Sequence, residues 1–313
     1  MNSSASNPQN SSNPLFRLWL PALFCCGLWG MAPSLIKSGY DLMNIHQTGT
    51  ILVFAGLRFF LAGILVLAFE KLIHKQSIRI QKTDILPIVV LAFFQTFGQY
   101  LFYYLGAAKA SGMMVSVLSG LSALIALMIS AWIFRLEKMT ALKLSGCLLG
   151  LAGVVVMNLG TGGLVFKANA EGMILISQVF SAFSAVLIQI FSRKSSPVLL
   201  SGWQFALGGA VLTISGLCMQ ADPIAWNGMG VLVLLLLALV SAGAYTLWGV
   251  LLSKWPVSSV GVFGCSIGLF GVLFSALILH ESLSWKTLLS CLLISGGILL
   301  VNLKVSSLSK PEA

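Results

Sequence analysis

One arginine, Arg58, interrupts an apolar run that covers residues 49 to 69, and no carboxylate lies at a similar depth in any apolar run of the chain. A charge that is buried among apolar side chains without a partner is costly. Two interpretations follow. The guanidinium could anchor an anionic group such as a carboxylate, which arginine binds through two parallel hydrogen bonds. Alternatively, it could have a structural role and hydrogen-bond to the backbone at helix ends.

Other polar side chains recur at helical spacing inside later apolar runs. Gln95, Gln99 and Tyr103 follow one another at intervals of four residues, so a helix would place them on one broad face. The same logic applies to the polar residues of two further runs, Ser119, Ser122 and Gln178. These side chains either line a polar cavity or hydrogen-bond to a neighbouring helix.

Three aromatic residues lie inside apolar runs rather than at their ends, namely Trp29, Tyr245 and Trp248. Their rings could stack on an apolar or aromatic ligand, and ordinary packing between helices is the alternative.

Three charged residues stand at the ends of apolar runs. Glu137 and Glu281 are candidates for a gate or a proton-responsive site, and the alternative is a cap at the N-terminus of the next helix, where negative charge is favourable. Lys37 either extends to a polar surface or lines the mouth of a cavity.

Several kinds of chemistry find no support in the sequence. His46, His74 and His280 are scattered, the six cysteines show no metal-ligand spacing, and no nucleophile stands at a readable distance from a base. A Walker A motif is absent, so ATP is not expected to be the direct source of energy. We therefore predict no catalytic residue, no metal site and no cofactor, and a membrane-embedded enzyme or a scaffold remains a remote alternative.

The composition predicts the environment in which these residues must be held. The chain has 313 residues, of which 58% are hydrophobic and 8% are charged, whereas soluble domains carry about 25% charged residues. The apolar residues occur in runs of about twenty, the length that crosses a bilayer as a helix. We therefore expect an all-α membrane protein. The formal net charge of +10 comes from short loops between the runs, so nucleic acid is not an expected partner.

Ten transmembrane helices are predicted, with short connections between them. They cover residues 17–37, 49–69, 85–105, 113–134, 142–159, 172–192, 199–219, 230–252, 260–279 and 286–304. If the N-terminus is cytoplasmic, thirteen Lys and Arg residues lie in inside loops and tails and four lie outside. Because cytoplasmic loops are enriched in positive residues, we expect both termini in the cytoplasm and the protein in the inner or plasma membrane.

An internal repeat is the most informative pattern. Spans four and five recur as spans nine and ten at an offset of 144 residues, and span two recurs as span seven at an offset of 146. The matched pairs include Glu137 and Glu281, Cys147 and Cys291, Asn158 and Asn302, Gly56 and Gly202, Gly63 and Gly209, and Arg58 and Gln204. Because each unit has five helices, the second copy must cross the membrane in the opposite sense. Inverted repeats are typical of alternating-access transporters, whose substrate site lies near the midplane between the two halves.

The chain resembles the drug/metabolite transporter superfamily, in its ten-helix EamA-like branch, over nearly its whole length. The residues that carry the resemblance are Trp29-Gly30, Lys37, Arg58-Phe59, Tyr103-Tyr104-Leu105, Arg135-Leu136-Glu137 and Leu279-His280-Glu281. Members often have a proline thirteen residues before each of the two Glu residues, and this chain has Leu124 and Gly268 there. The resemblance implies a central cavity that opens alternately to each side of the membrane.

These observations predict four segments and one function. The segments are a cytoplasmic N-tail (1–16), a first EamA-like repeat (17–160), a second, inverted repeat (161–304) and a cytoplasmic C-tail (305–313). The expected function is secondary transport, with export of amino acids or amphipathic metabolites first and uptake or exchange as the alternative. The glycines of Gly146-x-x-x-Gly150 allow close packing within the chain or, less simply, a homodimer.

Overall fold

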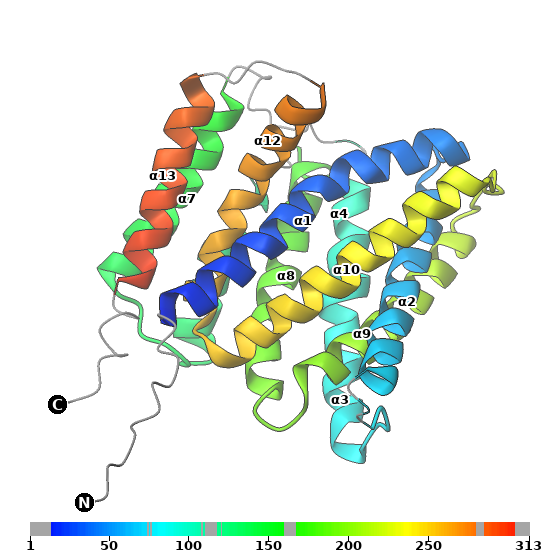
Figure 1. Ribbon diagram of the computed structural model, residues 1–313, viewed down its shortest axis with the longest axis horizontal. Coiled ribbons are helices and arrows are strands. Elements are labelled where there is room, and N and C mark those ends of the chain that lie inside the picture. The colour runs from blue at the N-terminus through cyan, green and yellow to red at the C-terminus, as the bar shows by residue number, and fades with distance from the viewer. Residues whose placement is uncertain are drawn as a thin grey trace, which may run out of the picture.

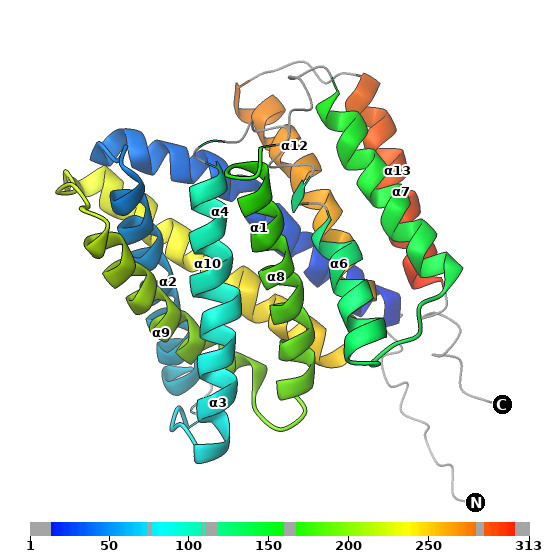
Figure 2. The same cartoon turned by 180° about the vertical axis from the view of Figure 1, so that it is seen from behind.

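A computed structural model describes residues 14–73, 75, 77–107, 109, 118–119, 121–159, 167–279 and 285–303, and no strand occurs within these ranges. Seven helices are long and apolar enough to cross a membrane, and three shorter apolar helices, Ser122–Ile133, Ala141–Val156 and Val257–Gly271, lie among them (Figures 1 and 2). The prediction of an all-α membrane protein is thereby confirmed for the described residues.

The helices of the first half follow one another with short connections. They are α1 (Pro14–Met43), α2 (Thr48–Leu72), α3 (Lys82–Leu91) with η1 (Ala92–Gly98) and α4 (Gln99–Ala107), α6 (Ser122–Met128) with η2 (Ile129–Ile133), and α7 (Ala141–Asn158). Segments η1 and η2 are π-helical. A π-helical segment has a wider turn than an α-helix, so it shifts the face on which the following residues lie.

The second half is likewise built of helices with short connections between the described ones. Its helices are α8 (Glu171–Phe191), α9 (Pro197–Cys218), α10 (Gly228–Lys254), α11 (Val257–Gly261) with the 3₁₀ segment η3 (Val262–Ser266) and α12 (Ile267–Leu279), and α13 (Trp285–Asn302). Side-chain caps fix three of the helix starts, because Thr140, Ser196 and Asn227 accept hydrogen bonds from backbone N–H groups of the first turns of α7, α9 and α10.

Two antiparallel helix pairs bring together segments that lie far apart in the sequence. In the α2–α9 pair, a Cβ added at Gly56 would lie 2.7 Å from the carbonyl oxygen of Gly209, and one at Gly63 would lie 2.6 Å from that of Gly202. Contacts that run in opposite sequence directions mean that the two helices are antiparallel. Only glycine allows backbones to approach so closely.

The α7–α13 pair is built in the same way. A Cβ at Gly146 would lie 2.8 Å from the Gly297 carbonyl oxygen, and one at Gly153 would lie 3.0 Å from that of Ser290. The Gly146 face is therefore occupied within the chain, and a homodimer through other surfaces stays a prediction. Figures 1 and 2 show this pair side by side at one flank of the bundle.

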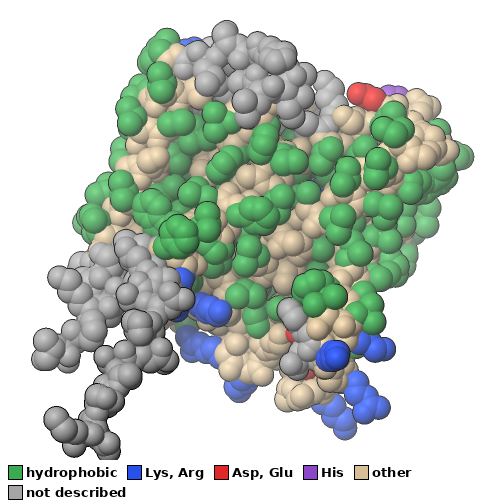
Figure 3. Space-filling model, viewed as in Figure 1, with side chains coloured by type: hydrophobic (Ala, Val, Ile, Leu, Met, Phe, Trp, Pro, Cys, Tyr) green, Lys and Arg blue, Asp and Glu red, His purple; other side chains and the backbone are tan. Residues whose placement is uncertain are grey.

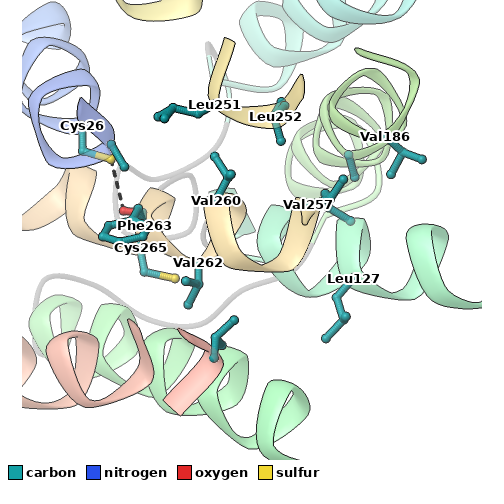
Figure 4. Packing of buried hydrophobic residues seen from close by; sticks show 14 of the residues in the cluster. Cys26, Leu127, Val186, Leu251, Leu252, Val257, Val260, Val262, Phe263 and Cys265 are labelled. Atoms are coloured by element: carbon teal, nitrogen blue, oxygen red, sulfur yellow. Dashed lines mark hydrogen bonds between the residues drawn. The ribbon is translucent and has the colours of Figure 1, made fainter. Parts of the chain in front are cut away.

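The largest buried cluster lies where α1, α6, α8 and α10 meet the α11–η3–α12 segment and the α7–α13 pair. Figure 4 shows its centre, where Val260, Val262 and Phe263 point among side chains of the surrounding helices. The Cys26 thiol donates to the Phe263 carbonyl oxygen at 3.2 Å. The described cysteines are free, and four of them, Cys25, Cys26, Cys147 and Cys265, are buried.

The surface divides into an apolar middle and basic ends. Figure 3 shows hydrophobic side chains over the middle of the bundle and most of the visible Lys and Arg side chains along one end. The start of α1 and the end of α13 lie toward that same end (Figure 1). This distribution is the one expected of a protein that spans a bilayer.

Candidate functional site

Arg58 lies at the contact between the two halves of the chain. It belongs to α2, its side chain is 3% exposed, and its Nε donates a hydrogen bond of 2.7 Å to the Ser241 Oγ of α10. The guanidinium carbon also lies 5.2 Å from the centre of the Phe59 ring, within range of a cation–π interaction. Among the residues that the structure describes, no carboxylate pairs with Arg58.

All five tyrosines of the chain gather around this arginine. They are Tyr40 of α1, Tyr100, Tyr103 and Tyr104 of α4, and Tyr245 of α10, and each hydroxyl interacts electrostatically with the guanidinium. The Tyr104 hydroxyl lies close to the guanidinium, and the hydroxyls of Tyr100 and Tyr245 hydrogen-bond to each other. We call Arg58, Ser241 and the five tyrosines the Arg58 cluster.

Apolar rings continue the Arg58 cluster toward α1. The ring of Trp29 lies 4.8 Å from that of Tyr245 and 5.0 Å from that of Trp248, measured between centroids. The three aromatic candidates of the sequence analysis are thus in contact with one another. Phe59 packs between Tyr100 and Phe205. The rings are partly covered, so this side of the cluster offers apolar surface next to a charge.

Two buried donors in this region lack a hydrogen bond of normal geometry to any described residue. They are the indole Nε1 of Trp29 and the hydroxyl of Tyr40. Buried polar groups in native structures nearly always have a partner, so each such group needs an explanation.

The predicted helical face of Gln95, Gln99 and Tyr103 is divided between two environments. Gln95 lies in η1, and its Oε1 accepts a 2.9 Å hydrogen bond from the Gln204 Nε2 of α9. Thr96 donates to the Oε1 of Gln204 at 2.7 Å. Gln95 therefore belongs to a fully paired helix contact, whereas Tyr103 belongs to the Arg58 cluster and Gln99 lies half-buried between them in sequence. The π-helical turn separates residues that an α-helix would align.

Three other polar candidates lie apart from the Arg58 cluster. Gln178 is buried in α8, Ser122 is half-buried at the start of α6, and Ser119 is half-buried three residues before that helix. No contact within the described residues joins them to Arg58 or Ser241. Lys37 lies in α1, but its side chain is outside the part of the chain that the structure describes, and Glu281 is likewise outside the described residues.

Glu137 makes a second contact between the halves. Its Oε1 accepts a 3.1 Å hydrogen bond from the backbone N–H of Ser258, its Oε2 accepts from the Ser258 hydroxyl, and the same oxygen pairs with Lys143. Glu137 therefore caps α11 in the second half, rather than the next helix, α7, which Thr140 caps. An open surface depression lies beside it, lined by Ala131, Arg135, Leu136, Glu137, Lys138 and Met139.

Of the Arg58 cluster, the sequence analysis singled out Arg58, Tyr103 and Tyr245, but not Ser241 or Tyr40. Ser241 and Tyr245 are four residues apart on α10, and Tyr100 and Tyr104 are four apart on α4, so each pair lies on one helix face. This spacing is a sequence signal that the residues of each pair act on a common surface. Which of these faces meets Arg58 depends on tertiary contacts across more than 180 residues of sequence. No group of three His, Cys, Asp or Glu residues suited to a metal occurs among the described residues.

Comparison with known proteins gives a consistent result. The EamA-like transporter family matches the chain twice, over residues 17–159 and 169–303. The chain is 30% identical over 270 residues to the uncharacterized transporter YvbV of Bacillus subtilis, covering 81% of this chain and 83% of that protein. It is 24% identical to the uncharacterized transporter YoaV of the same organism, covering 87% and 91%.

A crystal structure of another protein has the same fold. It superposes with a TM-score of 0.77 at 21% sequence identity and covers 91% of this chain and 98% of the other.

Proposed function

This chain belongs to the EamA-like transporter family and is a multi-pass membrane transporter, and from that premise we propose that it is a secondary transporter that exports small metabolites such as amino acids or amphipathic compounds. It works by alternating access through a central cavity between two inverted five-helix repeats. The observation that carries the proposal is the Arg58 cluster, in which a buried cation of the first half meets side chains of the second half.

Two observations support the inverted repeats. The family matches each half separately, over 17–159 and 169–303, and each range holds five of the apolar helical segments described above. The equivalent helices α2 and α9 pack against each other in antiparallel fashion, as do α7 and α13. Antiparallel packing of equivalent helices is what a two-fold axis in the membrane plane would produce.

The remaining helix contacts support the same symmetry. Helix α1 packs on α10 and α12, and its counterpart α8 packs on α4 and α6. If the halves are exchanged, α1 becomes α8, α10 becomes α4 and α12 becomes α6, so the first pair of contacts becomes the second. We therefore propose ten membrane spans, of which the three shorter ones, at 122–133, 141–158 and 257–279, complete the two sets of five.

The orientation follows from charge. With both termini in the cytoplasm, the exposed basic residues Lys71, Lys75, Arg79 and Lys82 of the connection between α2 and α3 lie inside. The positive-inside bias favours this arrangement. It places Glu137 at the cytoplasmic end and Glu281 at the outer end, and we propose that these two residues act as gates that alternately hold the halves together.

A comparison of metabolites released by cells tests transport. Cells that make the chain, cells with an empty vector and cells that make Arg58→Ala are grown to equal density, and small metabolites in the medium are quantified. We expect at least one to accumulate only with the unaltered chain. Equal release from all three strains, with the proteins present in the membrane in equal amounts, would contradict the proposal.

Uptake or substrate exchange is the second candidate, because the same site would serve either direction. It is distinguished by loading right-side-out vesicles with the released metabolite. Exchange predicts that external metabolite accelerates efflux of the internal pool, whereas simple export predicts no acceleration.

A further inference from the structure

The described helices contain one deep charge. Arg58 is the one Lys, Arg, Asp or Glu that lies more than seven residues from both ends of its helix. The described acidic residues all lie at helix ends or in connections; they are Asp41, Glu70, Asp84, Glu137, Glu171 and Asp222. The part of the chain that the structure describes therefore offers no carboxylate at the depth of Arg58 that could neutralise it or carry a proton.

Most of the N–H donors of Arg58 have no hydrogen-bond partner among the described residues. A guanidinium has five N–H donors, and the hydrogen-bond partner of Arg58 among the described residues is the Ser241 hydroxyl. The indole N–H of Trp29 and the hydroxyl of Tyr40 add donors that are buried and lack a well-formed hydrogen bond. A ligand that satisfies this region must bring acceptors and negative charge.

Aromatic rings pack around Arg58. The rings of Trp29, Trp248 and Tyr245 pack together on one side, and Phe59 lies under the guanidinium. An acceptor-rich, charged head next to an aromatic wall fits a ligand with a carboxylate at one end and an apolar body. It offers no anionic partner for a ligand ammonium group.

We infer that the substrate is an amphipathic organic monoanion whose carboxylate binds Arg58 and whose apolar body lies against Trp29 and Trp248, and that it crosses the membrane without a coupled cation. The inference rests on the proposed function and narrows it. Arg58 stays with the protein, so each cycle moves one negative charge across the membrane.

Net charge movement determines the favourable direction. The cytoplasm of a cell is electrically negative, and a membrane potential of 100 mV changes the equilibrium ratio of a monovalent ion by about 50-fold. An uncoupled carrier for a monoanion is therefore driven outward by the potential alone. Export thus needs neither ATP nor a carboxylate that carries a proton through the membrane.

Binding to the purified chain is the first test. The probes are hexanoate, phenylacetate and N-acetyl-L-leucine, each beside its uncharged amide, with zwitterionic L-leucine as a further comparison, and thermal stability in detergent is the readout. We expect at least one acid to bind at least tenfold more tightly than its amide and more tightly than leucine. Failure of all three acids to bind, or equal binding of acids and amides, overturns the inference.

Transport under an imposed potential is the second test. Proteoliposomes with a potassium gradient and valinomycin are given the acid that binds best, and its uptake is measured at equal pH on both sides. We expect accumulation when the interior is positive, little uptake when it is negative, and no loss of accumulation when a protonophore is added. If uptake does not change with the imposed potential, but does respond when a pH gradient is imposed in a parallel assay, the anion is moved together with protons and the inference is overturned.

Variants link the effects to the site. Arg58→Gln is expected to lose the preference for acid over amide, and Arg58→Lys, which keeps the charge without the planar fork, to retain part of it. Lys254→Gln removes an exposed charge from the last turn of α10 and is expected to keep the full preference. If Arg58→Gln does not fold, the comparison of acid with amide on the unaltered chain still decides the question.

The outcomes separate this inference from the proposed function. If the chain causes release of a neutral or zwitterionic metabolite and binds none of the acids, the proposed transport function is supported and the inference of an anionic substrate is refuted. No release of any metabolite and no movement of any probe removes both.

Discussion

At the scale of single residues, the main feature of the molecule is the buried positive charge of Arg58. A guanidinium with 3% exposure would be costly among apolar helices, and the chain surrounds it with uncharged oxygens rather than with a carboxylate. Ser241 accepts a hydrogen bond from it, and the Phe59 ring lies beneath it. The positive charge is thereby held without being neutralised, which is what a binding site for an anion requires.

Ser241→Ala should destabilise the chain because it removes the acceptor of a buried, charged donor. The expected loss is about 1.5–3 kcal/mol, measured as a lower unfolding midpoint in detergent. Ser253→Ala in the same helix is the matched control, since its hydroxyl bonds only the carbonyl of Val250 within its own helix. Equal effects of the two substitutions would show that the hydrogen bond between Ser241 and Arg58 contributes no more to stability than the hydrogen bond within the helix.

Glu137 and Ser258 should behave as a coupled pair. The Glu137 carboxylate accepts from both the backbone N–H and the hydroxyl of Ser258, so Glu137→Gln and Ser258→Ala each remove part of one contact between the halves. In a double-mutant cycle on unfolding, we expect a coupling free energy of about 0.5 kcal/mol or more. Strictly additive losses would mean that the contact does not join the halves.

The sequence shows that Arg58 is an unusual residue, but it does not show which residues Arg58 contacts. An arginine in an apolar run is visible without a structure, whereas its bond to Ser241 spans 183 positions. The predicted glutamine face was altered by the π-helical turn at 92–98, because a change in helical pitch leaves no periodic signal in so short and apolar a segment.

At the scale of helices, glycine determines how closely equivalent segments approach. The α2–α9 contact depends on Gly56, Gly63, Gly202 and Gly209. The internal repeat in the sequence aligns Gly56 with Gly202 and Gly63 with Gly209. In the structure the contacts instead join Gly56 to Gly209 and Gly63 to Gly202. The proposed two-fold symmetry would account for both patterns, since exchanging the halves converts the contact of Gly56 with Gly209 into that of Gly202 with Gly63.

Gly209→Ala should separate α2 from α9, because the new Cβ would lie 2.4 Å from the backbone nitrogen of Phe60. Backbone atoms cannot move aside cheaply, so we expect a loss of about 1–3 kcal/mol. Gly243→Ala in α10 is the control, with no atom within 4 Å of its added Cβ. Its expected effect is neutral or slightly stabilising, as helix propensity favours alanine. The reverse order of stability would contradict the close approach.

Helix positions were largely predictable from hydrophobic runs, and helix ends were less so. Helix α1 continues to Met43, beyond the predicted end at 37, because nothing in the sequence terminates it before Asn44, whose φ of 55° leaves the helical region.

At the scale of the whole molecule, the proposed placement in a bilayer rests on the distribution of charge and on the proposed repeat symmetry. The apolar middle and the basic end seen in Figure 3 correspond to the two features that composition predicted. The close approach of the halves at Arg58 and at Glu137 was beyond the reach of sequence, since both contacts depend on how one half rotates against the other.

Labelling of Ser77→Cys tests the orientation. Ser77 is exposed in the connection between α2 and α3, which we place in the cytoplasm. The exposed Cys218 is first replaced by serine to remove background labelling. A membrane-impermeant thiol reagent should label the new cysteine only after the cells are opened. Labelling in intact cells would invert the proposed topology.

The most direct test of alternating access is the accessibility of the Arg58 cluster from each side of the membrane. Tyr103→Cys, in a chain without other cysteines, is exposed to a charged, membrane-impermeant thiol reagent in right-side-out and in inside-out vesicles. Phe93→Cys is the control, because Phe93 is 48% exposed on the apolar outer surface, where a charged reagent does not enter. We predict labelling of Tyr103→Cys in both vesicle types and none of Phe93→Cys. Labelling from one side alone, or from neither, would contradict a site that opens alternately to both.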